Sequence, residues 1–243
     1  MIFDVDGTLV DSNDAHARAW VQAFAEHGVT AAYESVRRAI GMGGDKLMPL
    51  VAGISDDSPK GKAIARRRGE IFQETWLPGL RPFPRTRELV ERLADDGFAL
   101  AVASSASEEE LRPLLDVAGV TDLIPIRTSS DDAEKSKPDP DIVQAAVRRT
   151  GCPPDRTIMI GDTPYDVEAA LGAGIQVVGF ECGGWRREDL RGASEVYRNA
   201  SELLDKYERS VFFRYRESFR LKAEATREQE KAEATREQEK TSR

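Results

Sequence analysis

The sequence predicts an α/β protein in which a parallel sheet is interrupted by a helical insertion. After residue 84, short apolar segments alternate with helical patterns, which is typical of a parallel sheet covered on both faces. A further apolar segment stands at the start of the chain, and the stretch between these parts has helical patterns without a strand candidate. We therefore expect a sheet domain of residues 1–12 and 82–210 and a helical cap of residues 13–81.

The first predicted strand, residues 1–3, runs directly into the acidic loop Asp4-Val5-Asp6-Gly7-Thr8. Side chains at i and i+2 of an extended chain point the same way, so Asp4 and Asp6 share one pocket unless the loop turns them apart. Two carboxylates this close repel each other and need a cation or a shared proton, which favours a hard metal such as Mg²⁺. A solvated turn that caps the next helix is the alternative for this stretch alone.

The predicted cap contains four helical patterns. The first carries Ala17, Trp20, Val21 and Phe24 at helical spacing and stops near Gly28. Sites in open α/β sheets form at the carboxyl ends of strands, so an insertion directly after the first strand lies over the site as a lid. The four helices are expected at residues 14–27, near 33–40, near 47–51 and at 58–76.

The sheet domain resumes after the stiff segment Pro82-Phe83-Pro84. Ser107 and Glu110 have the spacing of a capping box at the start of a helix. Further strands are expected at residues 98–103, 123–127, 157–160 and 175–180, and helices at 85–96, from 107, at 140–150 and at 164–171.

The chain ends in a charged segment, residues 211–243, that contains the sequence AEATREQEK twice, at 223–231 and 232–240. These residues favour helix but leave almost nothing to bury, so a solvated helix or a disordered tail is predicted. An interaction role is the alternative.

Composition narrows the class of protein. A chain of 243 residues with 40% hydrophobic residues can bury a core, and its net charge of −8 argues against broad binding to nucleic acid. Cys152 and Cys182 form neither a disulfide framework nor a metal motif, and no secretion signal or membrane span is recognisable. A cytoplasmic protein is expected, with no nucleic-acid or membrane partner.

Four polar features follow the ends of predicted strands. Each has a structural alternative: a loop hydroxyl, a surface lysine, or acids that cap a helix. Because the carboxyl ends of parallel strands meet at one edge of a sheet, their joint occurrence indicates a site. The features are the pair Asp4 and Asp6, the pair Ser104 and Ser105, Lys137, and the pair Asp162 and Asp166.

In these motifs and their order, residues 1–208 resemble the haloacid dehalogenase-like (HAD) phosphohydrolases. The matching segments are Asp4-Val5-Asp6-Gly7-Thr8, Ser104, Lys137 in Ser-Lys-Pro-Asp-Pro, and Gly161-Asp162-x-x-x-Asp166. The resemblance implies a Rossmann-like core with an inserted helical cap, in the phosphoglycolate-phosphatase-like or β-phosphoglucomutase-like subgroup. The chain departs from the family in having only three residues before Asp4, where the family's first strand is usually longer.

The resemblance also implies phosphoryl transfer from a small phosphorylated metabolite. Asp4 is the expected nucleophile and Asp6 the expected acid and base, while Ser104, Ser105 and Lys137 hold phosphoryl oxygens. Mg²⁺ is expected on Asp4, the backbone carbonyl of Asp6 and Asp162, with Asp166 orienting this shell. A sugar-phosphate mutase is the close alternative, and a scaffold acting through the tail is the alternative of another class.

Two further residues of the predicted cap are candidates for substrate contact. Lys46, beside the glycine-rich turn at 41–45, is a candidate for binding an anionic group, or else a surface lysine. His16 is a candidate for steadying Asp6 or touching substrate, or else a core histidine. A monomer is expected, with a dimer as the alternative.

Overall fold

The computed structural model describes residues 1–218 and 220. The chain divides into two compact units, Met1–Leu204 and Asp205–Arg243. In the second unit residues 211–218 are helical, and the repeats at 223–240 lie outside the described residues. No helix within the described part of the chain is both long enough and apolar enough to cross a membrane.

The first unit is built on a five-stranded sheet in the order β2-β1-β3-β4-β5, with every pairing parallel. The first strand of the chain is an interior strand, the second in this order: Ile2 is in register with Ala101 of β2 on one side and with Met159 of β3 on the other. This confirms the predicted α/β class and parallel sheet. The strands are β1 (Ile2–Phe3), β2 (Ala101–Val102), β3 (Ile158–Gly161), β4 (Gln176–Phe180) and β5 (Glu195–Tyr197).

The sheet differs from the prediction at both edges. The strand predicted at 123–127 is wrong: the segment makes one isolated bridge, between Ile126 and Ala101. The short stretch that does pair lies at 126–128: the N–H of Val102 donates to Ile126 O at 3.0 Å, and the N–H of Thr128 donates to Val102 O at 3.1 Å. The other edge strand, β5, has three residues, too few for a recognisable alternation.

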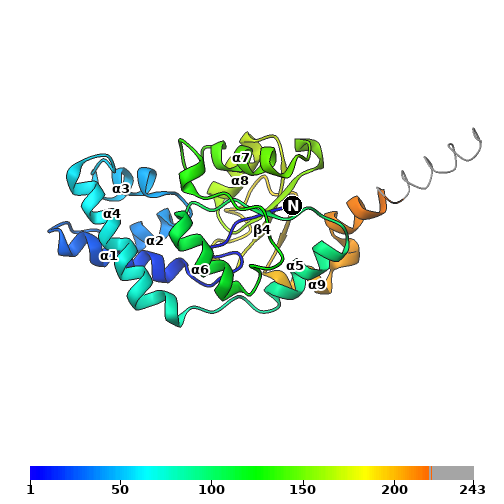
Figure 1. The fold of residues 1–243 in the computed structure, drawn as a ribbon, viewed down its shortest axis with the longest axis horizontal. Coiled ribbons are helices and arrows are strands. Elements are labelled where there is room, and N and C mark those ends of the chain that lie inside the picture. The colour runs from blue at the N-terminus through cyan, green and yellow to red at the C-terminus, as the bar shows by residue number, and fades with distance from the viewer. Residues whose placement is uncertain (219, 221–243) are drawn as a thin grey trace, which may run out of the picture. The chain divides into compact units, whose positions relative to one another are not determined.

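Helices cover both faces of the sheet (Figure 1). One face forms an apolar core in which Ile142 and Ala146 of α7 and Ala170 of α8 pack against Met159 and Val177 of the sheet. The helices between and after the strands are α5 (Thr86–Asp95), α6 (Glu108–Ala118), α7 (Asp141–Thr150), α8 (Pro164–Gly172) and α9 (Ala200–Asp205).

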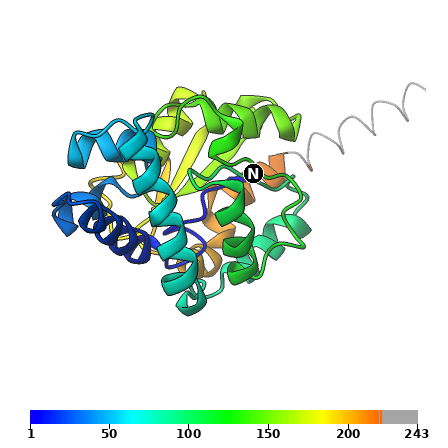
Figure 2. The ribbon, with the colours of Figure 1, turned by 60° about the vertical axis from the view of Figure 1, so that its left-hand side comes forward.

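Every named element between β1 and α5 is a helix, and these helices form their own group beside the sheet in both views (Figures 1 and 2). Its entry and exit segments meet, because Asp11 N–H donates to Arg81 O at 3.0 Å and Phe83 N–H donates to Leu9 O at 3.1 Å. We call residues 13–81 the helical insertion; its assignment as a separate cap domain stays a prediction. The insertion contains α1 (Asn13–Glu26), α2 (Tyr33–Ala39), α3 (Gly44–Ala52), α4 (Pro59–Ile71), the π-helix η1 (Phe72–Trp76) and the short η2 (Leu77–Gly79).

Candidate active site

Asp4 stands at the carboxyl end of β1. Its N–H extends the β1–β3 ladder by one bond, to Ile160 O at 2.9 Å, so its backbone is fixed by the sheet. Its buried carboxylate meets Lys137, whose Nζ lies 2.5 Å from Asp4 Oδ1 and 2.8 Å from Asp166 Oδ1. The Lys137 side chain is 0% exposed, so this lysine is not a surface residue.

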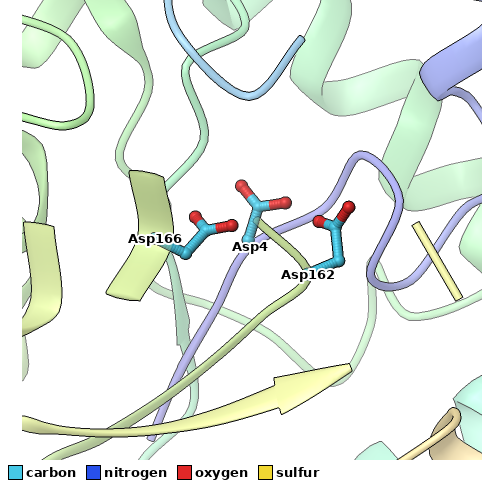
Figure 3. Close-up of side chains that lie close together, drawn as sticks. All are labelled: Asp4, Asp162 and Asp166. Carbon is cyan, nitrogen blue, oxygen red and sulfur yellow. The ribbon is translucent and has the colours of Figure 1, made fainter. Parts of the chain in front are cut away.

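Three carboxylates converge at this point. Asp4, Asp162 and Asp166 each place an oxygen within 4.8 Å of the other two, and Figure 3 shows the three groups side by side. Asp162 follows β3, and its oxygens accept hydrogen bonds from Thr8 Oγ1 at 3.0 Å and Asn13 Nδ2 at 2.9 Å. The carboxyl ends of the strands therefore bring together side chains that are distant in the sequence.

The excess of negative charge shifts the acids. Burial, together with Asp166 and Asp6 and against the attraction of Lys137, raises the pKa of Asp4 to about 7. Burial and the charges of Asp166 and Asp4 raise the pKa of Asp162 well above its usual value. Burial alone would lower the pKa of Lys137, but Asp166 and Asp4 raise it above its usual range, so Lys137 stays charged. One ammonium does not balance three carboxylates.

The site's chemistry fits a hard divalent cation such as Mg²⁺, because its donors are carboxylate oxygens gathered in one buried place. Asp166 is already engaged on both oxygens. Its Oδ2 accepts bonds from the Thr163 N–H at 3.0 Å and hydroxyl at 2.7 Å in a capping box, while Oδ1 faces Lys137. Helix capping and a place in the site are thus combined in this residue.

The Asp6 carboxylate turns away from this cluster. Its Oδ1 lies 2.8 Å from His16 Nε2 and 2.5 Å from Ser12 Oγ, and the His16 ring is stacked on Phe72 with centroids 3.9 Å apart. Burial opposes ionisation, but the contacts with His16 and Ser12 outweigh it and lower the pKa of Asp6. The predicted use of the Asp6 carbonyl by a metal stays a prediction.

A cavity of about 40 Å³ lies between the helical insertion and the sheet. Asp4, Asp6, His16 and Ser105 are part of its lining, whereas Ser104 is fully buried and does not line it. Ser104 Oγ accepts the Ala106 N–H at 3.1 Å, and Ser105 donates to Gly41 O at 3.1 Å. This volume holds a few water molecules.

Lys46 does not line the cavity. Its Nζ pairs with Asp139 at 2.5 Å, and both side chains are about one-third exposed. Beside it, the Ser136 hydroxyl donates to Asp45 and accepts the Gly43 N–H at 3.0 Å. The turn at 43–46 therefore contacts the loop that carries Lys137.

The cation that lines the cavity from the insertion is Arg68 of α4, which the sequence analysis did not single out. Its guanidinium lies 5.0 Å from the centre of the Trp20 ring. The signal was available in the spacing, because Arg68 follows the buried Ile64 by four positions and precedes the buried Ile71 by three.

Residues 1–180 match the haloacid dehalogenase-like hydrolase family. The chain belongs to this family, which confirms the resemblance carried by its four motifs. It is therefore an enzyme of the hydrolase class, similar to the family's phosphatases.

Individual relatives cover most of the chain. A phosphoglycolate phosphatase of Rhodospirillum rubrum is 31% identical over 216 residues, which is 84% of this chain and 89% of the relative. An N-acetylmuramic acid 6-phosphate phosphatase of Pseudomonas aeruginosa is 26% identical over 87% of this chain and 95% of the relative. The crystal structure of a hydrolase from Pseudomonas syringae has a TM-score of 0.80 at 27% identity, covering 86% of this chain and 97% of that one.

Proposed function

We propose that the protein is a Mg²⁺-dependent phosphatase that hydrolyses a small phosphomonoester metabolite through a phosphorylated Asp4. The observation that carries this proposal is the position of Asp4. Its carboxylate is at once part of the cavity lining, 2.5 Å from Lys137 and a member of the acidic cluster. A carboxylate that attacks an anionic substrate needs positive charge beside it. Lys137 supplies one such charge, and a cation held by the acidic cluster would supply more.

In the first step an oxygen of Asp4 attacks phosphorus while the ester oxygen departs. Asp6, which lines the same cavity, is proposed to give that oxygen a proton. Its lowered pKa in the free protein keeps it ionised, but a phosphate dianion beside it raises the pKa and favours the protonated form. In the second step Asp6 takes a proton from the water that releases phosphate from Asp4.

The remaining residues act on charge and orientation. Lys137 neutralises part of the charge on the transferring group, and Ser104 and Ser105 are proposed to hold its oxygens. Asp4, the Asp6 carbonyl and Asp162 would hold Mg²⁺, with Asp166 orienting this shell. When bound, Mg²⁺ supplies the charge that lets a carboxylate approach a phosphate.

The first test is phosphate release from p-nitrophenyl phosphate, with Mg²⁺ and with excess chelator. Asp4→Asn is expected to abolish turnover, because an amide is not a nucleophile for this reaction, and Asp6→Asn to be severely impaired. Asp11→Asn is the matched control, since Asp11 is exposed in the same loop. Near-normal kcat in either site variant, or full activity in chelator, would refute the proposal.

A second test separates hydrolysis from mutase chemistry, since both proceed through phosphorylated Asp4. The enzyme is given β-glucose 1-phosphate with a trace of the 1,6-bisphosphate. Free phosphate is expected as the main product, whereas glucose 6-phosphate forming faster would show a mutase. Absence of turnover on every phosphomonoester would favour a scaffold, the alternative that places function in the tail. The proposed setting is the cytoplasm.

A further inference from the structure

A buried ion pair lines the same cavity as Asp4 and Asp6. Nη1 of Arg68, on α4, lies 2.7 Å from both carboxylate oxygens of Glu110, on α6. The Arg68 side chain is 17% exposed and that of Glu110 is 4% exposed, and both line the cavity. The pair joins the insertion to the sheet part of the fold, and α4 runs beside α6 in Figure 1.

Local structure leaves Glu110 available for this pairing. The capping box predicted for Ser107 and Glu110 is absent, since the Ser107 side chain makes no capping bond. Asp131 instead accepts the N–H of Glu108 at 3.0 Å in the first turn of the helix. A carboxylate expected to satisfy its own helix is therefore directed at Arg68.

The pair also retains unused hydrogen-bonding capacity. Nε of Arg68 is buried without a partner, which is costly unless a ligand accepts from it. The carboxylate oxygens of Glu110 each accept one bond from Arg68 and retain capacity for a second. The pair therefore holds an unpaired donor beside two acceptor oxygens, on two residues that line the cavity.

The charge of Arg68 is not available to attract a second anion. Glu110 opposes it within hydrogen-bond distance, and Lys137 is opposed by Asp4 and Asp166. Lys46 is paired with Asp139 outside the cavity. Among the residues that the structure describes, each lysine or arginine that lines this cavity or contacts Asp4 is paired with a carboxylate.

We propose that the Arg68–Glu110 pair selects phosphomonoesters whose leaving group is uncharged and hydroxylated, and disfavours those that carry a carboxylate or a second phosphate. A hydroxyl can donate to Glu110 and accept from Arg68 Nε at once. A carboxylate cannot donate, and it meets the like charge of Glu110 at short range. This inference rests on the proposed phosphatase function.

The test compares kcat/KM for glycerol 3-phosphate and 3-phosphoglycerate, which share a three-carbon skeleton and differ by a hydroxymethyl group against a carboxylate. The wild type is expected to favour glycerol 3-phosphate at least tenfold. Glu110→Gln is expected to lower this preference at least tenfold, because Arg68 is then free to attract the carboxylate. Arg68→Gln is expected to raise the preference, because Glu110 is then unopposed.

The two variants are expected to shift the substrate preference in opposite directions, and a loss of packing would not produce this result. Glu109→Gln removes the same charge from an exposed position of the same helix and should leave the preference unchanged. Thermal unfolding checks each variant; if Glu110→Gln does not fold, Arg68→Gln and the double variant carry the test. A wild type that favours 3-phosphoglycerate, or variants that shift the preference the same way, would overturn the inference.

Failure of the proposed function gives a different result, namely no Mg²⁺-dependent phosphate release from these esters or from p-nitrophenyl phosphate. Calorimetric binding of the same two esters to the wild type then decides the inference. Tighter binding of glycerol 3-phosphate supports it, and equal or tighter binding of 3-phosphoglycerate overturns it.

Discussion

Replacing Lys137 by methionine removes the buried positive charge that Asp4 and Asp166 share while keeping a side chain of similar length. The two ion-pair distances are 2.5 and 2.8 Å. At an effective dielectric constant of ~20 each contact contributes a gross attraction of roughly 6 kcal/mol, much of it offset by desolvation. Removing one partner of a buried pair typically lowers the free energy of unfolding by about 3–5 kcal/mol.

For a folded unit of this size, each kcal/mol shifts the Tm by about 2–4 °C. The metal-free Lys137→Met variant is therefore expected to unfold roughly 6–20 °C below the wild type. The assay is calorimetric unfolding in excess chelator at neutral pH. Lys135→Met, two positions earlier at an exposed site, is the matched control and is expected to unfold within about 2 °C of the wild type.

The penalty is expected to depend on pH with a definite sign. The pKa of Asp4 is about 7 in the folded protein against a reference of 3.8, so between these values the folded state holds a proton that the unfolded state has lost. The metal-free wild type should therefore lose stability as the pH rises through this range. Without Lys137 the pKa of Asp4 rises further, so the loss continues at higher pH.

Lys137→Met should consequently lower the free energy of unfolding more at pH 8 than at pH 5. At pH 5 Asp4 is protonated, so the substitution removes only the ion pair between Lys137 and Asp166. Turnover should fall about 10²–10³-fold if Lys137 stabilises the transferring group. A Tm within 2 °C of the wild type at pH 8, or a penalty larger at pH 5, would refute this account of the buried charges.

Two further variants test the metal site. Asp162→Ala should raise the Mg²⁺ concentration for half-maximal phosphate release at least tenfold, with Ca²⁺ a poor substitute because of its larger and looser shell; an unchanged Mg²⁺ requirement would exclude Asp162 as a ligand. Gly183→Ala would place a Cβ 1.6 Å from Asp162 Oδ2, so it should displace that carboxylate, weaken Mg²⁺ binding and lower stability by ~1–3 kcal/mol. Gly79→Ala, with nothing within 4 Å of the added carbon, should change neither quantity, and equal behaviour of the two glycine variants would contradict the clash.

The parallel sheet was predictable because alternation of apolar segments and helices is a property of many residues together. Its edges were not, because the pairing there is too short to leave a recognisable pattern in the sequence. The predicted strand at 123–127 forms a single bridge at Ile126, and β5 is only Glu195–Tyr197. The interior strands β1, β3 and β4, which pair on both sides, were each predicted to within one residue at either end.

The candidate site likewise contains residues that the sequence predicts and one that it does not. Asp4 and Asp162 meet because the parallel strands β1 and β3 end at one edge of the sheet, which sequence order predicts. Asp166 follows in α8, whereas Lys137 reaches them from a loop that no strand directly precedes. Arg68 was missed because it follows Arg66 and Arg67, and a basic run is usually a solvated helix face. Here Arg67 does pair with an exposed acid, Glu26, while the next residue turns inward.

The contact between Ser136 and the turn at 43–46 has a thermodynamic consequence. Ser136 precedes Lys137, and its hydroxyl binds both Asp45 and the Gly43 N–H. The segment 136–137 therefore both contacts the helical insertion and carries the lysine that pairs with Asp4. If the turn at 43–46 and Lys137 change position together, a ligand that stabilises the contact of the turn with Ser136 also stabilises Lys137 in its position beside Asp4. Substitutions in the glycine-rich turn should therefore alter substrate affinity and the electrostatics at Asp4 together, even though none of those residues reaches the nucleophile.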